Sequence, residues 1–325
     1  MKIRTAAALF LTAILAPQAG RGAALALSLE AGMAAGFGGS AYDLAVEDVG
    51  GEVLSRLEFP LDSPMVALSM GLAAGDPSRP SWLFNLSLAR NLSSPSGLMR
   101  DYDWVEWEGY PRIPFSYTES EVEGESFQLE VRAAKRLWAS GGFACLLSAG
   151  YRYQLIVQDI LGYKGWQYVW NDGLWAYDLY LVSSTLKALH YELTLHAPML
   201  GAAFSWHPHP RFTASLSTHY LLVFASDLDD HLLRSKLSTS SGVGHGFAAS
   251  FSARYTLGAP GGRTLPYLAL EGSFLTLGVN TTQRQEWYGD DPGLPGDETG
   301  MVFTGIDHEI TSTQFQIGLT AGIEF

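Results

Sequence analysis

Apolar and polar side chains alternate one by one along several segments of this chain, and this period of two limits what it can fold into. The pattern is clearest in residues 315–325, where Phe, Ile, Leu and Ala alternate with Gln, Gly, Thr and Glu. It recurs in residues 82–88, 212–224 and 247–256. Successive side chains of a β-strand point to opposite faces, so each segment has one apolar and one polar face. The sequence therefore predicts an all-β protein.

The N-terminal residues have the features of an export signal. Lys2 and Arg4 precede a short apolar stretch, residues 6–16, and Ala24-Leu25-Ala26 fits the small-residue pattern of a cleavage site. We therefore expect residues 1–26 to be a signal peptide. Residues 27–325 contain no linker, repeat or low-complexity segment, so we expect them to form a single domain.

No segment after the signal approaches the roughly 20 uninterrupted apolar residues that a membrane helix needs. A membrane-embedded form of the chain must therefore be a closed β-barrel, because a closed sheet satisfies its backbone hydrogen bonds in lipid. A soluble β-sandwich can show the same period, but it would not need 15 Tyr, 16 Phe and 9 Trp beside only 16% charged residues. These features favour a barrel of the bacterial outer membrane, surrounded by membrane lipid.

Short and long connections alternate along the chain. The short ones are residues 75–78, 140–142, 207–210 and 258–262, and the long polar ones are residues 40–51, 92–117, 158–186, 227–242 and 281–307. Outer-membrane barrels alternate short periplasmic turns with longer external loops in this way. Four turns and five loops predict a ten-stranded antiparallel transmembrane β-barrel with extended external loops and both chain ends on the periplasmic side.

The final residue, Phe325, ends the clearest of the predicted strands. A terminal strand that closes on an aromatic residue resembles the last strand of bacterial outer-membrane proteins. This resemblance implies recognition by the barrel-assembly machinery, and it agrees with the destination that the export signal indicates.

The chain is acidic, with 33 Asp and Glu against 20 Lys and Arg and a formal net charge of −13. The excess argues against a nucleic-acid partner and favours cationic substrates. Composition alone is better explained by acidic loops that keep the exterior soluble, so the positions of the acids matter more than their number. Cys145 is the only cysteine, which excludes an internal disulfide and a cysteine-based metal site.

Two short acidic clusters follow predicted outward-running strands, and in a barrel both would emerge at the same rim. They are Asp101-Tyr102-Asp103-Trp104 and Asp227-Leu228-Asp229-Asp230-His231. Asp229 and His231 are two residues apart, so they project to one side of an extended segment, where the carboxylate stabilises the imidazolium. Asp101 and Asp103 have the same spacing, and two close carboxylates tend to share a proton. Water held between the two pairs could lose a proton and attack a carbonyl carbon.

These clusters resemble the two site motifs of the omptins, a family of outer-membrane proteases built on ten-stranded barrels. The family combines Asp-x-Asp-Trp on one loop with Asp-x-Asp-x-His on another, and both patterns are intact here. The likeness extends through residues 50–59, 149–151 and 197–201. It implies an aspartyl-type endopeptidase, a hydrolase that needs no cofactor and has its active site on the cell exterior.

The resemblance also implies roles for individual residues in hydrolysis. His231 and Asp101 would hold the attacking water, while Asp229 orients His231 and Asp103 supports Asp101. These four residues are the catalytic candidates.

Three further residues are candidates for substrate binding by the same resemblance. Asp227 matches an acid at the floor of the pocket that accepts a basic side chain, which implies polypeptide substrates cleaved at basic residues. The family's second acidic pocket residue aligns with Tyr42, so the preference for the residue before the cleaved bond is expected to be altered. Glu119 matches an acidic stretch that lines the neighbouring pocket.

Omptins also bind lipopolysaccharide, through a Tyr-x-Glu-x-Arg motif and further basic residues. The matching residues here are Tyr151-Arg152-Tyr153-Gln154-Leu155, and the matched basic position beyond them is Thr194. The resemblance therefore does not carry activation by this lipid over to this chain.

Other groups of polar residues have simpler explanations than a reactive site. Two histidines with metal-ligand spacing lie in a proline turn, so no metal site is expected (His207, His209). A serine–histidine group that a lipid hydrolase could use is better explained as polar lining of the lumen (Ser215, Ser217, His219). An acidic, glycine-rich stretch fits no calcium-binding pattern and is better explained as an external loop (Asp290, Asp291, Asp297, Glu298).

The main alternative to a protease is a barrel without catalysis. It could be an inactive relative with an acidic loop, or an adhesin, envelope scaffold or narrow pore. Ten strands leave little open lumen once side chains fill it, which weighs against a general porin. The two interpretations differ in whether the four catalytic candidates converge in space.

Overall fold

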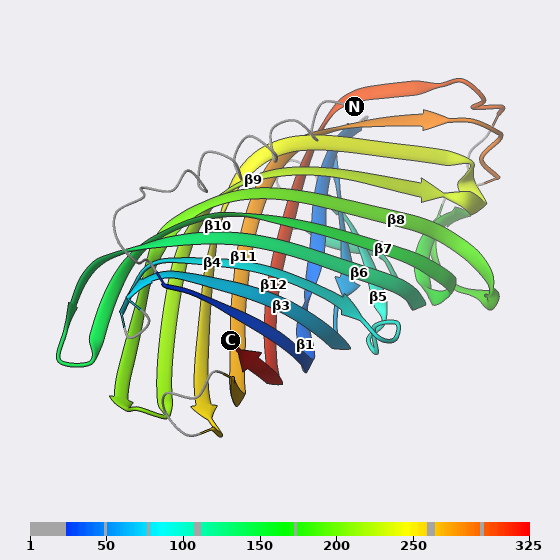
Figure 1. Ribbon diagram of the computed structural model, residues 1–325. Coiled ribbons are helices and arrows are strands. Elements are labelled where there is room, and N and C mark those ends of the chain that lie inside the picture. The colour runs from blue at the N-terminus through cyan, green and yellow to red at the C-terminus, as the bar shows by residue number, and fades with distance from the viewer. Residues whose placement is uncertain are drawn as a thin grey trace.

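The computed structural model describes residues 24–48, 51–76, 79–106, 112–171, 174–258, 264–292 and 296–325. These residues form one antiparallel sheet that closes on itself as a barrel (Figure 1). Most of the predicted signal peptide lies outside the described residues, and its last residues, Ala24–Ala26, begin the first strand. The described residues contain no helix that is long and apolar enough to cross a membrane.

The described residues form twelve strands and one short 3-10 helix. They are β1 (Ala24–Asp48), β2 (Gly51–Pro60), β3 (Ser63–Asp76), β4 (Arg79–Asn91), β5 (Met99–Glu106), β6 (Ile113–Ser140), β7 (Phe143–Asn171), β8 (Leu174–His209), β9 (Phe212–His231), η1 (Leu232–Arg234), β10 (Lys236–Thr256), β11 (Leu265–Trp287) and β12 (Val302–Glu324).

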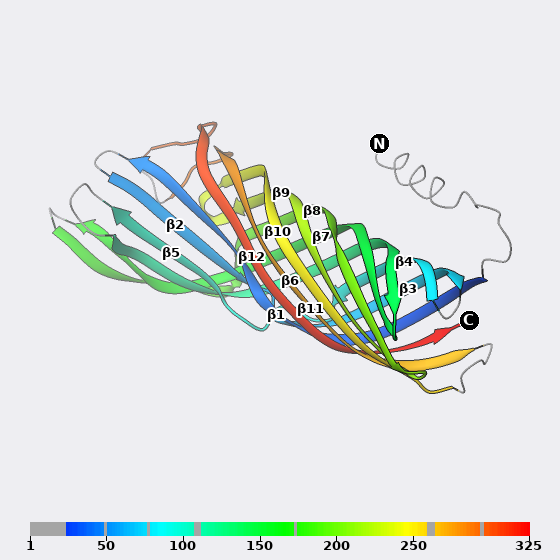
Figure 2. The ribbon, with the colours of Figure 1, turned by 90° about the vertical axis from the view of Figure 1, so that its left-hand side faces the viewer.

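Ten strands close the ring at either end of the barrel, so the ten-stranded prediction is confirmed. At the end where β1 begins, β1 pairs with β3, β4 follows, and β6 to β12 complete the circle back to β1. Toward the other end, β2 and β5 take the places of β3 and β4 between β1 and β6. Figure 2 shows β2 and β5 at the opposite end of the barrel from the C-terminus.

The long polar segments between the membrane strands are mostly strand rather than irregular loop. β7 and β8 pair as far as Asn171 and Leu174, so residues 158–171 and 174–186 form the two arms of a tall hairpin. Asp101 and Asp103 lie within β5, and Asp227 to His231 are the last residues of β9. The polarity of these segments reflects contact with water on their outer face, while the backbone continues to bond to its neighbours as it does in the membrane.

The outer face of the barrel carries an apolar belt around the end where β1 begins and β12 ends. On β10 the exposed large apolar side chains are Val243, Phe247, Phe251 and Tyr255, and matching residues on the other strands include Met33, Leu68, Leu147, Leu200, Leu216, Leu270 and Leu319. On β10 the exposed residue beyond the belt is polar, Ser241. An apolar band of this kind is the surface that an outer-membrane barrel presents to lipid.

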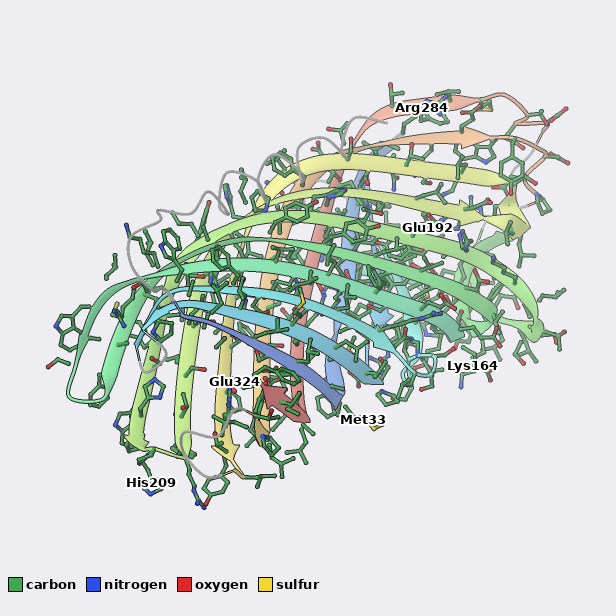
Figure 3. The ribbon with its side chains drawn as sticks, in the orientation of Figure 1. Met33, Lys164, Glu192, His209, Arg284 and Glu324 are labelled. Carbon is green, nitrogen blue, oxygen red and sulfur yellow. The ribbon has the colours of Figure 1, made fainter. Side chains whose placement is uncertain are left out.

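The two ends of the barrel differ in what they carry. Leu27 and Phe325 exchange backbone hydrogen bonds at the end that holds the belt. Figure 3 labels His209 and Glu324 at this end and Lys164 and Arg284 at the other. In the lumen, buried apolar side chains from several strands form a cluster at the level of the acidic motifs, including Phe59, Leu193, Leu221, Val223 and Ile310. The acids therefore stand against an apolar layer that fills this part of the lumen.

The belt makes a prediction about insertion into lipid. Phe247→Arg puts a charge on the outer face within the belt, and we expect it to destabilise the inserted barrel by about 2–4 kcal/mol. Ser241→Arg lies on the same face of the same strand but beyond the belt, and we expect a loss of about 0–1 kcal/mol. Urea unfolding from lipid vesicles, followed by tryptophan fluorescence, measures both. Equal losses in the two variants would mean that the belt does not mark the membrane.

Candidate active site

The second acidic motif reaches the lumen because it continues the alternation of β9. Asp227, Asp229 and His231 occupy every second position of β9, so they share the inward face of the strand. On the neighbouring β10, Ser240 stands opposite Asp227, Ser238 opposite Asp229, and Lys236 opposite His231. The site therefore consists of three levels along the barrel axis, and each level holds one residue of β9 and its partner on β10.

Asp229 and His231 are in direct contact. His231 Nε2 lies 3.2 Å from Asp229 Oδ2, and the Tyr42 hydroxyl, which reaches across the lumen from β1, donates a hydrogen bond to the same oxygen. Burial alone would raise the pKa of Asp229, but His231, the Tyr42 hydroxyl and Lys236 hold that pKa below its ordinary value. Burial lowers the pKa of His231 against the pull of Asp229. Near neutral pH the pair is therefore a carboxylate beside a neutral imidazole.

The first acidic motif faces this pair from β5. Asp101 stands at the level of Tyr42, with Leu57 of β2 between them. Burial, followed by the charges of Asp103 and Asp229, raises the pKa of Asp101 well above its ordinary value. Asp103 accepts a hydrogen bond of 2.5 Å from the Ser116 hydroxyl of β6. Burial therefore favours the protonated form of Asp101.

The two motifs meet in one site without bonding to each other directly. Among the described residues, no hydrogen bond joins Asp101 or Asp103 to Asp229 or His231. Asp101 Oδ1 and Asp229 Oδ1 are both buried and have no hydrogen-bond partner in the described part of the chain. Each of these carboxylate oxygens is thus free to accept a hydrogen bond from a water molecule or a ligand.

Asp227 lies one level deeper than Asp229 and has a different environment. The Ser240 hydroxyl donates to its Oδ1 at 2.5 Å, and His308 Nε2 of β12 is 3.5 Å from its Oδ2. Burial raises the pKa of Asp227 to about 7, against the Ser240 hydrogen bond. Burial also lowers the pKa of His308 to about 4, so this imidazole is neutral and the contact is not an ion pair at neutral pH, although its distance would allow one.

Tyr42 is part of a packed group of rings rather than an open pocket wall. Its side chain is buried, and its ring centroid lies 4.7 Å from that of His308, 5.8 Å from Phe59 and 5.9 Å from Tyr191. Burial, together with the charge of Asp229, raises the pKa of Tyr42 well above its ordinary value, so the phenol remains a donor. The structure brings Tyr42 to the catalytic candidates through Asp229.

Glu119 is the one candidate that the structure does not bring to the others. The register of β5 and β6 pairs Asp101 with Thr118, which leaves Glu119 on the opposite face beside Arg100. There Glu119 accepts a hydrogen bond of 2.6 Å from Tyr117 and lies 3.6 Å from Lys164 Nζ. Its contacts are with the outer surface of the hairpin.

Lys236 is a site residue that sequence reasoning missed. Its side chain is buried at the level of His231, and its ammonium lies 5.8 Å from the ring centroid of Trp287. Burial lowers the pKa of Lys236 to about 8, yet its charge acts on both Asp101 and Asp229. The available signal was the alternation of Lys236, Ser238 and Ser240, which places all three on the lumen face directly after the motif.

Comparison with known proteins gives information about the fold only. No protein-family model matches the sequence, and no curated protein matches it. The crystal structure of the outer membrane protease OmpT from Escherichia coli matches with a TM-score of 0.67 and 14% identity, covering 93% of this chain and 96% of that one. The fold is OmpT-like.

Other outer-membrane barrels match far less well than OmpT. The translocator domain of the autotransporter NalP from Neisseria meningitidis has a TM-score of 0.27 at 11% identity, covering 96% of this chain and 94% of that one. A FadL homologue from Pseudomonas aeruginosa has a TM-score of 0.26 at 11% identity, covering 92% and 90%. The resemblance to omptins, drawn from the motifs, is confirmed as a likeness of fold.

The remaining polar groups have structural partners in the OmpT-like barrel. His207 and His209 bond to Thr213 and to the backbone of Arg211 within their turn. Ser217 bonds to Ser250, and His219 to Ser148, in the lumen between membrane strands. In the loop after β11, Asp291 pairs with Arg234 at 2.8 Å, and its backbone amide donates to Glu298.

The environment of Asp227 predicts a pH dependence of stability. Its folded-state pKa of about 7 lies above the unfolded value of about 4, so the folded barrel binds the extra proton between these limits. Stability from this group is present below pH 4 and is lost as the pH rises through 7. Asp227→Asn removes that term, which is worth up to about 4 kcal/mol.

Urea midpoints of the wild type and of Asp227→Asn, measured from pH 4 to pH 8, test this expectation. The wild-type midpoint should fall more steeply with pH than that of the variant. Parallel curves would show that Asp227 ionises normally in the folded barrel.

Proposed function

We propose that this chain is an outer-membrane endopeptidase of omptin-like mechanism. The observation that carries the proposal is the Asp229–His231 pair, a buried carboxylate holding a neutral imidazole, which faces a second acid of raised pKa, Asp101. A neutral imidazole in this position is a general base, and a protonated carboxyl group opposite it can return a proton.

The proposed reaction uses these groups in sequence. Water bound between Asp101 and His231 gives a proton to the free imidazole nitrogen, Nδ1, while Nε2 stays bonded to Asp229. The oxygen attacks the peptide carbonyl carbon, and the charge that develops on the carbonyl oxygen is favoured by the buried cation of Lys236. Proton transfer to the amide nitrogen then releases the amine, and the carboxylic acid forms on the other fragment.

Asp227 supports a preference for basic residues next to the cleaved bond. Its Oδ2 is buried and has no hydrogen-bond partner among the described residues, one level below the catalytic pair. A guanidinium or ammonium group placed there would form a charge-assisted hydrogen bond and would lower the pKa of Asp227, so that the carboxylate ionises. The acidic balance of the whole chain would attract such peptides.

The proposed active site faces the cell exterior. The site lies at the end of the barrel away from Leu27 and Phe325, beyond the apolar belt. Outer-membrane barrels keep their chain ends and short turns on the periplasmic side, which supports this orientation.

A non-catalytic barrel remains the second candidate, as an adhesin, scaffold or narrow pore. The observation in its favour is the tall β7–β8 hairpin, which exposes Tyr177, Leu179 and Leu181 far beyond the belt. The apolar cluster in the lumen weighs against a pore. An adhesin would explain the hairpin but not why two acidic motifs meet in the lumen.

The base assignment is tested with a quenched fluorescent peptide that contains an Arg-Arg bond, cleaved by refolded protein with and without added lipopolysaccharide. His231→Ala should lower kcat roughly 10²–10⁴-fold, because the general base is lost. The matched control is His190→Ala, whose imidazole also contacts two carboxylates, Asp159 and Glu192, but lies away from the lumen. It should stay within about twofold of the wild type. Full activity in His231→Ala would sink the assignment.

Specificity is tested by comparing peptides with arginine or its neutral isostere citrulline before the cleaved bond. The wild type should favour arginine, and Asp227→Ala should reduce the ratio of the two kcat/KM values by roughly tenfold or more. The rate on the citrulline peptide should change less, since Asp227 does not touch the reacting atoms. An unchanged ratio would locate the pocket for the basic side chain elsewhere.

A further inference from the structure

Tyr42 and Tyr191 are two buried tyrosines in one ring cluster, and their hydroxyls differ in a way that points to a role. Their ring centroids are 5.9 Å apart, and both side chains are buried. The Tyr42 hydroxyl donates to Asp229 Oδ2, whereas the Tyr191 hydroxyl has no hydrogen-bond partner among the described residues. The Tyr42 phenol is therefore bonded to a catalytic candidate, and the Tyr191 phenol is not.

We propose that Tyr42 is a positioning residue for the Asp229–His231 pair, acting through the hydrogen bond from its phenol to Asp229. This inference rests on the proposed function and deepens it. The alignment of Tyr42 with a pocket residue implies contact with the substrate side chain. We infer instead that Tyr42 makes no such contact, because its hydroxyl is bonded to Asp229 and its ring is enclosed by other rings.

The rings around Tyr42 hold the phenol in one place. Phe59 and Tyr191 stack at 4.1 Å with an interplanar angle of 9°, and Tyr42 packs against both of them and against His308. A side chain packed on several sides in this way has no second rotamer to adopt without displacing its neighbours. The hydroxyl is therefore aimed at Asp229 before any substrate arrives.

A fixed donor on Asp229 has two effects on His231. The same oxygen, Oδ2, accepts from Tyr42 and from His231 Nε2, so the phenol fixes the carboxylate plane against which the imidazole is oriented. The donor also takes up part of the carboxylate's negative charge, which weakens the pull of Asp229 on a second imidazole proton. Both effects keep His231 neutral and correctly turned for accepting a proton from water.

Other charged and titratable groups surround the pair, and all are retained when only the phenol is changed. They are Asp101 on β5, Tyr191 on β8, Asp227 on β9, Arg234 in η1, Lys236 on β10 and His308 on β12. A change produced by Tyr42→Phe is therefore a property of the Tyr42 hydroxyl itself.

The test compares Tyr42→Phe with Tyr191→Phe, which removes a hydroxyl of the same cluster that bonds to nothing described. Tyr42→Phe should lower kcat roughly tenfold, leave KM within about twofold and leave the arginine-to-citrulline ratio unchanged. The acid limb of its pH–rate profile should move to higher pH, because His231 becomes easier to protonate. Tyr191→Phe should match the wild type in every respect, and heat-modifiable migration in gels should report a folded barrel for both.

A second readout does not depend on turnover. NMR titration of labelled histidine, with the His231 signal assigned by its loss in His231→Ala, should give a higher His231 pKa in Tyr42→Phe than in Tyr191→Phe. Equal titrations and equal kcat in the two variants would overturn the proposal. A changed KM or arginine preference with unchanged kcat would also overturn it, in favour of a pocket role. If the wild type cleaves no peptide but the His231 pKa is higher in Tyr42→Phe than in Tyr191→Phe, the Tyr42 contact is supported and the proposed hydrolysis is refuted.

Discussion

Closure of the hydrogen-bonded ring is the constraint on which the rest of the structure depends. Because β1 pairs with β12, every described strand has a partner on both sides within the apolar belt. Well above the belt, residues 174–189 of β8 pair with β7 alone. The same ladder continues beyond the apolar belt, where β2 and β5 replace β3 and β4 without changing the number of strands in the ring. A narrow closed ring forces its walls to face each other at short range. The acids of β5 and β9 therefore meet in the lumen although neither strand pairs with the other.

Confinement of several acids in one lumen would be costly if all of them were ionised. The structure divides the charge instead. Asp229 stays ionised because His231, Tyr42 and Lys236 surround it, while burial keeps Asp101 and Asp227 more protonated. This division suits the proposed hydrolysis, because the base His231 needs an ionised partner in Asp229 and the acid Asp101 needs to keep its proton. The apolar layer against which the acids stand supplies the burial that separates their pKa values.

The period of two and the spacing of turns were sufficient to predict ten strands, and the i, i+2 spacing of each motif was sufficient to predict which acids share a face. The contact of Tyr42 with Asp229 was not predictable, because 187 residues separate them and only the closed ring brings their strands face to face. Glu119 was assigned to the substrate pocket by alignment rather than by strand alternation. Ser116 and Ser120 of β6 are buried on the inner face, so Glu119 faces outward. The local sequence pattern determines which side chains of one strand share a face. Contacts across the lumen depend in addition on the pairing register of every strand around the barrel.

A likeness of fold at 14% identity describes the backbone, so any activity must be argued from the site itself. Here the two inward levels of β9 are electrostatically linked, because the charge of Asp229 is one reason why Asp227 resists ionisation. A neutral side chain bound beside Asp227 leaves this conflict in place, and Asp227 keeps its proton. A cationic side chain removes it, since both carboxylates can then be ionised at once without net repulsion in the lumen. Substrate charge would thus be recognised by the state of two stacked acids rather than by the shape of a pocket.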